Sequence, residues 1–186
     1  MFFRQKKIVL ADDDKETVGF LFKMRLPSLI VGLFLGMALS FFTSRFEEVL
    51  SKNVSVAFFI PLVVYLADAV GTQTQSIYTR ALKDGKANFK GYLFKEWLLG
   101  IFFGIVFSLL SALIIFLWFK SVPLTWAVSL AMFSAVSSAP IVALIVTEGL
   151  QLERKDPAVG AGPIATVIQD TASVCIYGII ASLILL

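Results

Sequence analysis

Long apolar runs separated by short polar segments make up most of the chain. Five of these runs are long enough to cross a bilayer, although the first is near the short limit. A transmembrane helix needs about 20 predominantly apolar residues, because its backbone polar groups must be hydrogen-bonded within the helix. The pattern therefore predicts an all-α, multi-pass integral membrane protein with five transmembrane helices. The predicted helices cover residues 26–43, 54–78, 97–119, 124–147 and 158–186.

The basic residues between these runs predict the orientation in the membrane. Lys and Arg number six before the first run, two in the first loop, five in the second, one in the third and two in the fourth, and none follows Lys155. Cytosolic loops carry an excess of Lys and Arg. The alternation predicts a cytosolic amino terminus and a carboxyl terminus outside, in a protein of the cell membrane.

Residues 1–25 are polar and mixed in charge, and we expect them to form a cytosolic arm. Only the short apolar run 8–11 follows the first basic residues, so we expect no cleavable signal peptide. We interpret the acidic triplet at 12–14 as a solvated charge run. Residues 26–186 then form a five-helix transmembrane domain, and no room remains for a soluble domain.

Composition supports this class and narrows the chemistry. The 186 residues are 58% hydrophobic and 16% charged, whereas about 25% of a typical soluble domain is charged. The net charge of +3 is spread over the loops, which does not indicate nucleic-acid binding. With no His and one Cys, Cys175, the chain offers no soft metal site and no Cys–His nucleophile pair. A bound metal would need oxygen ligands, which favours a hard cation such as Mg²⁺ or Ca²⁺.

Small residues at helical spacing indicate where helices approach closely. Gly32 and Gly36 lie one turn apart in the first predicted helix, as Gly100 and Gly104 do in the third. Such pairs allow close helix contact, and we interpret them as packing features only. Pro140, inside the fourth predicted helix, is expected to kink it or to free backbone groups. The fourth helix also has a small face at Ser134, Ala135, Ser138 and Ala139.

Two acids lie deep inside apolar runs. Asp68 follows the outer end of the second run by 14 residues, and Asp170 follows the inner end of the fifth by 12. At 1.5 Å per residue both reach roughly the middle of the bilayer, and two helices of opposite direction can bring them to one level. An intramembrane carboxylate costs about 2.5–3.5 kcal/mol on insertion scales unless it faces protein or water. The pair therefore indicates an ion pathway.

Other oxygen-bearing groups surround the two acids. Pro61 and Pro163 each precede an acid by seven residues, and a proline in a membrane helix can expose a carbonyl oxygen as a further ligand. Amide and hydroxyl side chains could hold a cation through its water shell, or could instead hydrogen-bond between helices. Glu148 and Asp156 are expected at the interface or at an inner mouth. The predicted metal-site residues are Asp170, Asp68, Thr166, Gln169, Thr72 and Gln73.

Two segments carry a resemblance to a known family. Residues 61–85, PLVVYLADAVGTQTQSIYTRALKDG, resemble the second-span signature of MgtE-type magnesium channels and transporters. Residues 140–181 resemble the last two spans of that family, through Asp156-Pro157-Ala158, Gly162-Pro163, Asp170 and Tyr177. Lys95-Glu96-Trp97 resembles the opening of the third span and Arg25-Leu26-Pro27 the start of the first. The resemblance covers residues 23–186.

The resemblance implies a five-helix domain that forms a homodimer, with a pore between the protomers lined by the second and fifth helices. Asp170 stands where the family has its cation-binding aspartate. Two departures affect this expectation. Asp68 replaces a glycine and Ala69 an asparagine of the signature, which bears on ion selectivity, and we hypothesise that Asp68 replaces the lost polar ligand. The arm is also too short for the cytosolic regulatory domains, so gating should be absent or supplied by a separate partner.

Four functional hypotheses remain after the sequence alone. The leading one is a channel or transporter for Mg²⁺, with Mn²⁺, Co²⁺ and Ca²⁺ as candidate competitors. The second is a divalent cation carrier coupled to Na⁺ or H⁺, because a carboxylate at mid-membrane can bind a proton as well as a metal. A non-transporting membrane subunit is a third. An intramembrane aspartyl protease is disfavoured, since Ala67 and Gln169 stand where its usual Tyr-Asp and Gly-x-Gly-Asp contexts need Tyr and Gly. We therefore expect no enzyme activity.

Overall fold

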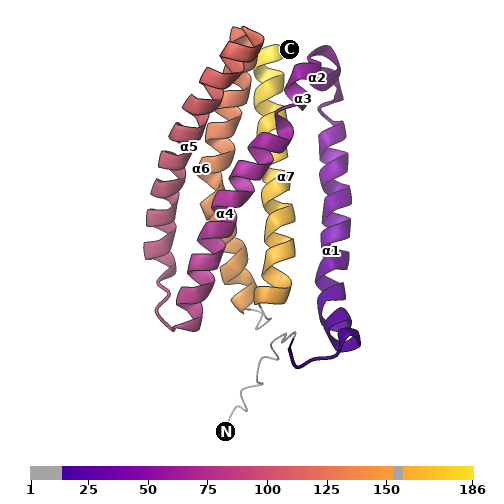
Figure 1. Ribbon diagram of the computed structural model, residues 1–186, viewed down its shortest axis with the longest axis vertical. Coiled ribbons are helices and arrows are strands. Elements are labelled where there is room, and N and C mark those ends of the chain that lie inside the picture. The colour runs from indigo at the N-terminus through magenta and orange to yellow at the C-terminus, as the bar shows by residue number, and fades with distance from the viewer. Residues whose placement is uncertain (1–13, 153–156) are drawn as a thin grey trace.

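The structure, a computed structural model, describes the backbone of residues 14–152 and 157–186 and the side chains of residues 14–149 and 164–186. Within these ranges all regular structure is helical, and no strand occurs (Figure 1). The helices are α1 (Val18–Ser44), α2 (Glu47–Lys52), α3 (Val54–Ala57), α4 (Ile60–Lys83), α5 (Phe89–Phe119), α6 (Val122–Leu152) and α7 (Pro157–Leu185).

Five stretches of the described chain are helical, long and apolar enough to cross a membrane, which confirms the predicted all-α, multi-pass membrane class. They are Val18–Ser44, Val54–Lys83, Phe89–Phe119, Val122–Gly149 and Ile164–Leu185. Because their number is odd, α1 begins and α7 ends at opposite ends of the bundle (Figure 1). We call the end where α1 begins the inner end and the opposite one the outer end, following the predicted orientation.

Local capping explains why two helices begin earlier than the apolar runs. The Thr17 side chain accepts a hydrogen bond from the backbone N–H of Phe20, and the Asn88 side chain accepts one from Gly91. Each cap satisfies an N–H group that has no partner within its own helix. As a result α1 and α5 each begin eight residues before the predicted spans.

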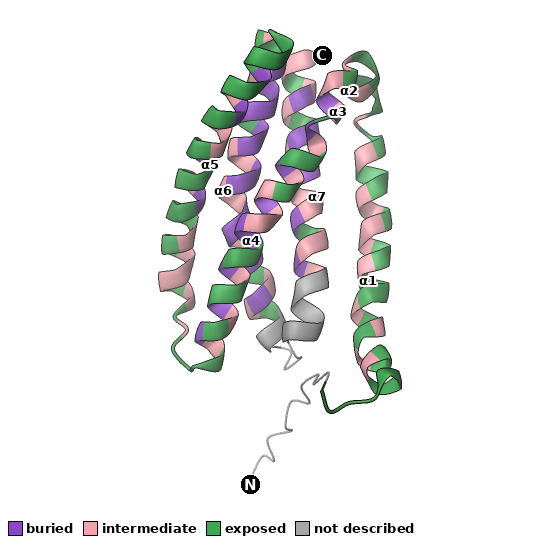
Figure 2. Ribbon diagram, in the orientation of Figure 1, coloured by how far each residue is buried: buried purple, intermediate pink, exposed green. Residues whose placement is uncertain are grey.

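Helix α6 is the centre of the bundle. It packs against α4, α5 and α7, and its buried positions are rich in small residues (Figure 2). Helix α1 has no buried residue and packs mainly against α7, so it stands at the edge of the bundle. The outward faces of α1 and α5 are apolar and exposed, as expected for contact with lipid. The buried small residues of α6 include Ala127, Ala131, Ala135, Ala139 and Ala143.

The two predicted glycine pairs have different surroundings in the structure. A Cβ atom on Gly104 would meet the Ser137 side chain of α6, and one on Gly100 would come within 3.0 Å of the Pro140 ring, so this pair gives the close helix contact that its spacing predicts. Gly32 and Gly36 have no neighbouring atom within 4 Å of such a Cβ in the described chain. The expected close approach therefore does not occur at the α1 pair within this chain. Helix α6 continues through Pro140, whose ring occupies the space left by Gly100.

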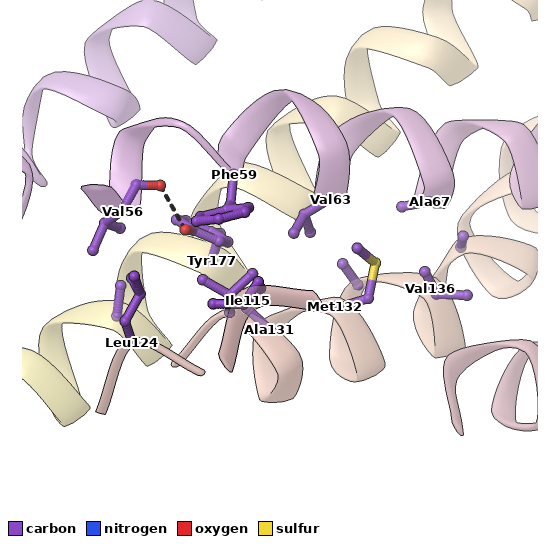
Figure 3. Packing of buried hydrophobic residues seen from close by; sticks show 14 of the residues in the cluster. Val56, Phe59, Val63, Ala67, Ile115, Leu124, Ala131, Met132, Val136 and Tyr177 are labelled. Carbon is purple, nitrogen blue, oxygen red and sulfur yellow. Dashed lines mark hydrogen bonds between the residues drawn. The ribbon is translucent and has the colours of Figure 1, made fainter. Parts of the chain in front are cut away.

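The chain between α1 and α4 forms two short helices. Helix α2 lies in the first loop, and α3 occupies the start of the predicted helix 54–78, which the structure interrupts before α4 begins at Ile60. Helices α2 and α3 cover the outer end of α7 and bury Val49 and Val56. The Tyr177 hydroxyl of α7 donates a 2.6 Å hydrogen bond to the Val56 carbonyl oxygen (Figure 3). The Phe46 ring lies so close to Gly178 that no Cβ atom would fit there. These contacts hold the outer half of the helix that carries Asp170.

Candidate cation site

The two intramembrane acids lie near each other across the contact between α4 and α7. Asp68 is on α4 and Asp170 on α7, and each side chain is partly exposed. The carboxylates are close enough for their charges to interact, and the Thr166 hydroxyl of α7 lies next to the Asp68 carboxylate as a potential hydrogen-bond donor. Thr166 precedes Asp170 by four residues, so both lie on the same face of α7. The structure thus brings three of the six predicted metal-site residues together.

This pair of acids has no basic partner. Among the residues with described side chains, no Lys or Arg forms an ion pair with Asp68 or Asp170, and no positive charge acts on either carboxylate. Two neighbouring carboxylates of low solvation disfavour their doubly charged state. A proton or a cation between them would relieve this repulsion.

The remaining predicted ligands lie in different surroundings. Thr72 follows Asp68 by one turn and is exposed on the same side of α4. Gln73 is also exposed but lies about 140° around the helix from Asp68. Gln169 is 3% exposed; its Nε2 donates a 3.2 Å hydrogen bond to the Ser173 hydroxyl, and its Oε1 has no partner in the described chain. The Gln169 bond therefore lies within α7 and does not join two helices, as its alternative interpretation had expected, while Thr72 remains near the acids.

The predicted proline contribution is not seen. Pro61 lies exposed in the first turn of α4, where a proline removes no hydrogen bond from the helix interior. It is also about 10 Å along the helix axis from Asp68. The prediction that Pro61 supplies a carbonyl ligand near Asp68 is therefore wrong. The side chain of Pro163 lies outside the described residues, as does Asp156.

A comparison with protein-family models matches the helices that surround the two acids. The family model MgtE, described as a divalent cation transporter, matches residues 60–180, which is more than half of the chain. The chain belongs to the MgtE family. The match begins at the first residue of α4 and includes Asp68, Thr166 and Asp170. Its members are transporters of the membrane, which agrees with the five spans and with the expectation that the chain is not an enzyme.

Individual relatives carry the same family name. The magnesium transporter MgtE of Enterococcus faecalis is 35% identical over 162 residues, covering 86% of this chain and 36% of the relative. The one of Bacillus subtilis is 32% identical over 156 residues, covering 82% and 35%. The one of Thermus thermophilus is 24% identical over 164 residues, covering 87% and 36%. The chain thus spans about a third of the length of the MgtE relatives it matches.

Two further polar contacts of this MgtE chain were not predicted. The Thr74 hydroxyl of α4 donates a 2.8 Å hydrogen bond to Glu96 of α5, and the Tyr78 hydroxyl donates a 2.6 Å hydrogen bond to Glu148 of α6. Both hydroxyl residues lie one turn apart on the buried face of α4, which also carries Ala67. Their spacing in the sequence could have shown that they face the bundle, but nothing in the sequence identifies their acceptors.

Proposed function

We propose that the chain is the transmembrane part of a Mg²⁺ transporter, and that Asp68 and Asp170 bind the ion on its path between α4 and α7. The proposal depends on the family membership and on the two interacting carboxylates at mid-span, neither of which forms an ion pair with a Lys or Arg whose side chain is described. The relatives are named as magnesium transporters, which favours Mg²⁺ among the divalent cations.

The chemistry of the pair suits this ion. Mg²⁺ usually keeps several of its water molecules and is bound through one or two carboxylates rather than by a complete cage of protein ligands. Two carboxylates neutralise its charge, and the Thr166 hydroxyl lies next to the Asp68 carboxylate. No group of three or more His, Cys, Asp or Glu side chains that could hold a metal occurs in the described part of the chain. Water must therefore supply most of the coordination.

A second copy of the chain would complete the site. Asp68 is flanked on α4 by Tyr65, which is 68% exposed, and by Thr72, also exposed, so its own chain leaves this side of the helix uncovered. A carboxylate facing lipid at this depth would be costly. We therefore propose a homodimer whose pore is lined by α4 and α7 of both protomers. Two copies would bring four carboxylates to the path, and a separate cytosolic protein could regulate it.

The experiment that tests this function is Mg²⁺ uptake into proteoliposomes under a membrane potential, with no Na⁺ or pH gradient. Uptake by the parent protein that is lost in Asp170→Asn supports a conductive path with Asp170 at its ion site. Competition by Mn²⁺, Co²⁺ and Ca²⁺ then ranks selectivity. If neither protein takes up Mg²⁺ under any imposed gradient, the proposed transport function is wrong and a non-transporting subunit is favoured.

One structural observation favours the coupled carrier as a second candidate. No Lys or Arg with a described side chain pairs with the two neighbouring carboxylates, so a proton would relieve their repulsion when no metal is bound. Release of Mg²⁺ would then be accompanied by proton uptake. Mg²⁺ uptake that requires a pH gradient, and that is accompanied by proton movement in the opposite direction, would favour the carrier over the conductive path.

A further inference from the structure

The inner half of α4 is held in place by two buried hydroxyl groups. Thr74 is 2% exposed and Tyr78 is 1% exposed. Each hydroxyl donates to a carboxylate of a different helix: Thr74 to Glu96 of α5 at 2.8 Å and Tyr78 to Glu148 of α6 at 2.6 Å. A hydrogen bond to a charged group is about twice as strong as one between neutral groups. Together the two bonds connect α4 to α5 and to α6 at positions one helical turn apart.

The Thr74–Glu96 bond has little support from packing, because α4 and α5 contact each other only over a short stretch. The Tyr78 ring is more firmly placed, since Phe89 and Tyr92 pack against it edge to face. The ring contacts fix where the hydroxyl group lies, and the carboxylate of Glu148 then fixes α4 relative to α6. Among the residues with described side chains, neither Glu96 nor Glu148 has a basic partner.

These bonds bear on the site because α4 is one continuous helix. It runs from Ile60 to Lys83 without an internal proline, so a change at Tyr78 is transmitted along it. Thr74 and Tyr78 lie about 9 and 15 Å along the axis from Asp68. A binding site needs its ligands held to within about 0.5 Å, which a small rotation of α4 would exceed.

We infer that Tyr78 and Glu148 are positioning residues: their hydrogen bond sets the rotation of α4 and so the placement of Asp68 opposite Asp170. The expected effect on Mg²⁺ uptake rests on the proposed transport function, whereas the expected effect on the rotation of α4 does not. In this arrangement Glu148 acts as an acceptor for a hydroxyl group rather than as a ligand of the cation. An amide oxygen in its place would serve the same purpose.

The first test compares four single variants and one double variant in the Mg²⁺ uptake assay. Tyr78→Phe keeps the ring and removes the donor, Glu148→Ala removes the acceptor, and Glu148→Gln keeps an acceptor oxygen without the charge. We expect the half-saturating Mg²⁺ concentration to rise about 3- to 10-fold in Tyr78→Phe and in Glu148→Ala, with no further rise when both are combined. Glu148→Gln should stay within about twofold of the parent. Tyr92→Phe is the matched control, since it removes a neighbouring hydroxyl group that makes no described hydrogen bond.

The uptake results also separate the alternatives. If Glu148→Gln is as damaging as Glu148→Ala while Tyr78→Phe matches the parent, Glu148 binds the cation and the inference is wrong. Parent-like kinetics in every variant would also contradict it.

A second measurement does not need transport, so it distinguishes failure of the inference from failure of the proposed function. Spin labels at Lys83 and Ile168, both exposed, would report the distance between α4 and α7, with Cys175 replaced by Ala and labelled protein diluted with unlabelled copies. We expect the distance distribution to shift or broaden in Tyr78→Phe and Glu148→Ala but not in Glu148→Gln or Tyr92→Phe. An unchanged distribution in all four variants would overturn the positioning role, whatever the uptake assay shows.

Discussion

Thr166 on α7, one turn from Asp170, lies next to the carboxylate of Asp68 on α4. This proximity brings the two helices together at the depth of the acids. A hydrogen bond from Thr166 would leave the remaining lone pairs of Asp68 available for a cation or its water. The candidate site is therefore formed by α4 and α7 together.

The Thr166 hydroxyl should matter for cation affinity more than for folding. In Thr166→Val the shape is kept and the donor is lost, and a hydrogen bond to a charged group contributes about 1.5–3 kcal/mol. We therefore expect the half-saturating Mg²⁺ concentration in the uptake assay to rise about 10-fold or more. Thr166→Ser keeps the hydroxyl and is the matched control. Equal kinetics in all three proteins would show that the Thr166 hydroxyl has no role in ion binding.

Asp68 should be required even though it stands where the family signature has a glycine. Replacing it with Ala removes one of the two charges that compensate the cation, so we expect Mg²⁺ uptake to fall at least about 10-fold. Asp84→Ala is the control, because Asp84 is an exposed carboxylate at the end of the same helix. Unchanged Mg²⁺ flux and block in Asp68→Ala would refute the hypothesis that Asp68 replaces the lost ligand.

The close contact of α5 with α6 gives a prediction about stability. A methyl group at Gly104 would meet the Ser137 side chain and, at 3.0 Å, the backbone oxygen of Phe133. We expect Gly104→Ala to lower the free energy of unfolding by about 1–3 kcal/mol, measured by thermal or denaturant unfolding in detergent. Gly36→Ala is the matched control because nothing lies within 4 Å of its added Cβ in the described chain. The assignment of the α5–α6 contact would be wrong if both variants unfolded alike.

The bond between α7 and α3 should stabilise the outer end of the bundle. Tyr177→Phe removes the donor to the buried Val56 carbonyl oxygen, and we expect a loss of about 1–2 kcal/mol in the same unfolding measurement. Tyr65→Phe removes a hydroxyl group from a ring that is 68% exposed and should have almost no effect. A larger loss in the control than in Tyr177→Phe would contradict the role of this bond.

The sequence was sufficient for the features that depend on hydropathy and depth. The five spans follow from run length, and the neighbouring positions of Asp68 and Asp170 follow from their depth in helices of opposite direction. Contacts that depend on which helix is adjacent could not be predicted. The acceptors of Thr74 and Tyr78 are far away in sequence, and helices α2 and α3 are too short to show a periodic pattern.

Pro61 shows a different limit of sequence reasoning. Its spacing of seven residues from Asp68 correctly predicts that both lie on nearly one face of α4. The spacing does not reveal that the helix begins at Ile60, which makes Pro61 part of the first turn. A proline in the middle of a helix would free a carbonyl group, but a proline in the first turn, such as Pro61, has no such effect.

The central claim is that Asp68 and Asp170 form one cation site. Equilibrium binding of Mg²⁺ to the purified protein, measured by calorimetry, tests it in four proteins: the parent, Asp68→Asn, Asp170→Asn and the double variant. If the two carboxylates hold the same ion, each single substitution should weaken binding nearly as much as both together. Single losses that multiply in the double variant, or a parent protein that binds no Mg²⁺, would contradict a shared site.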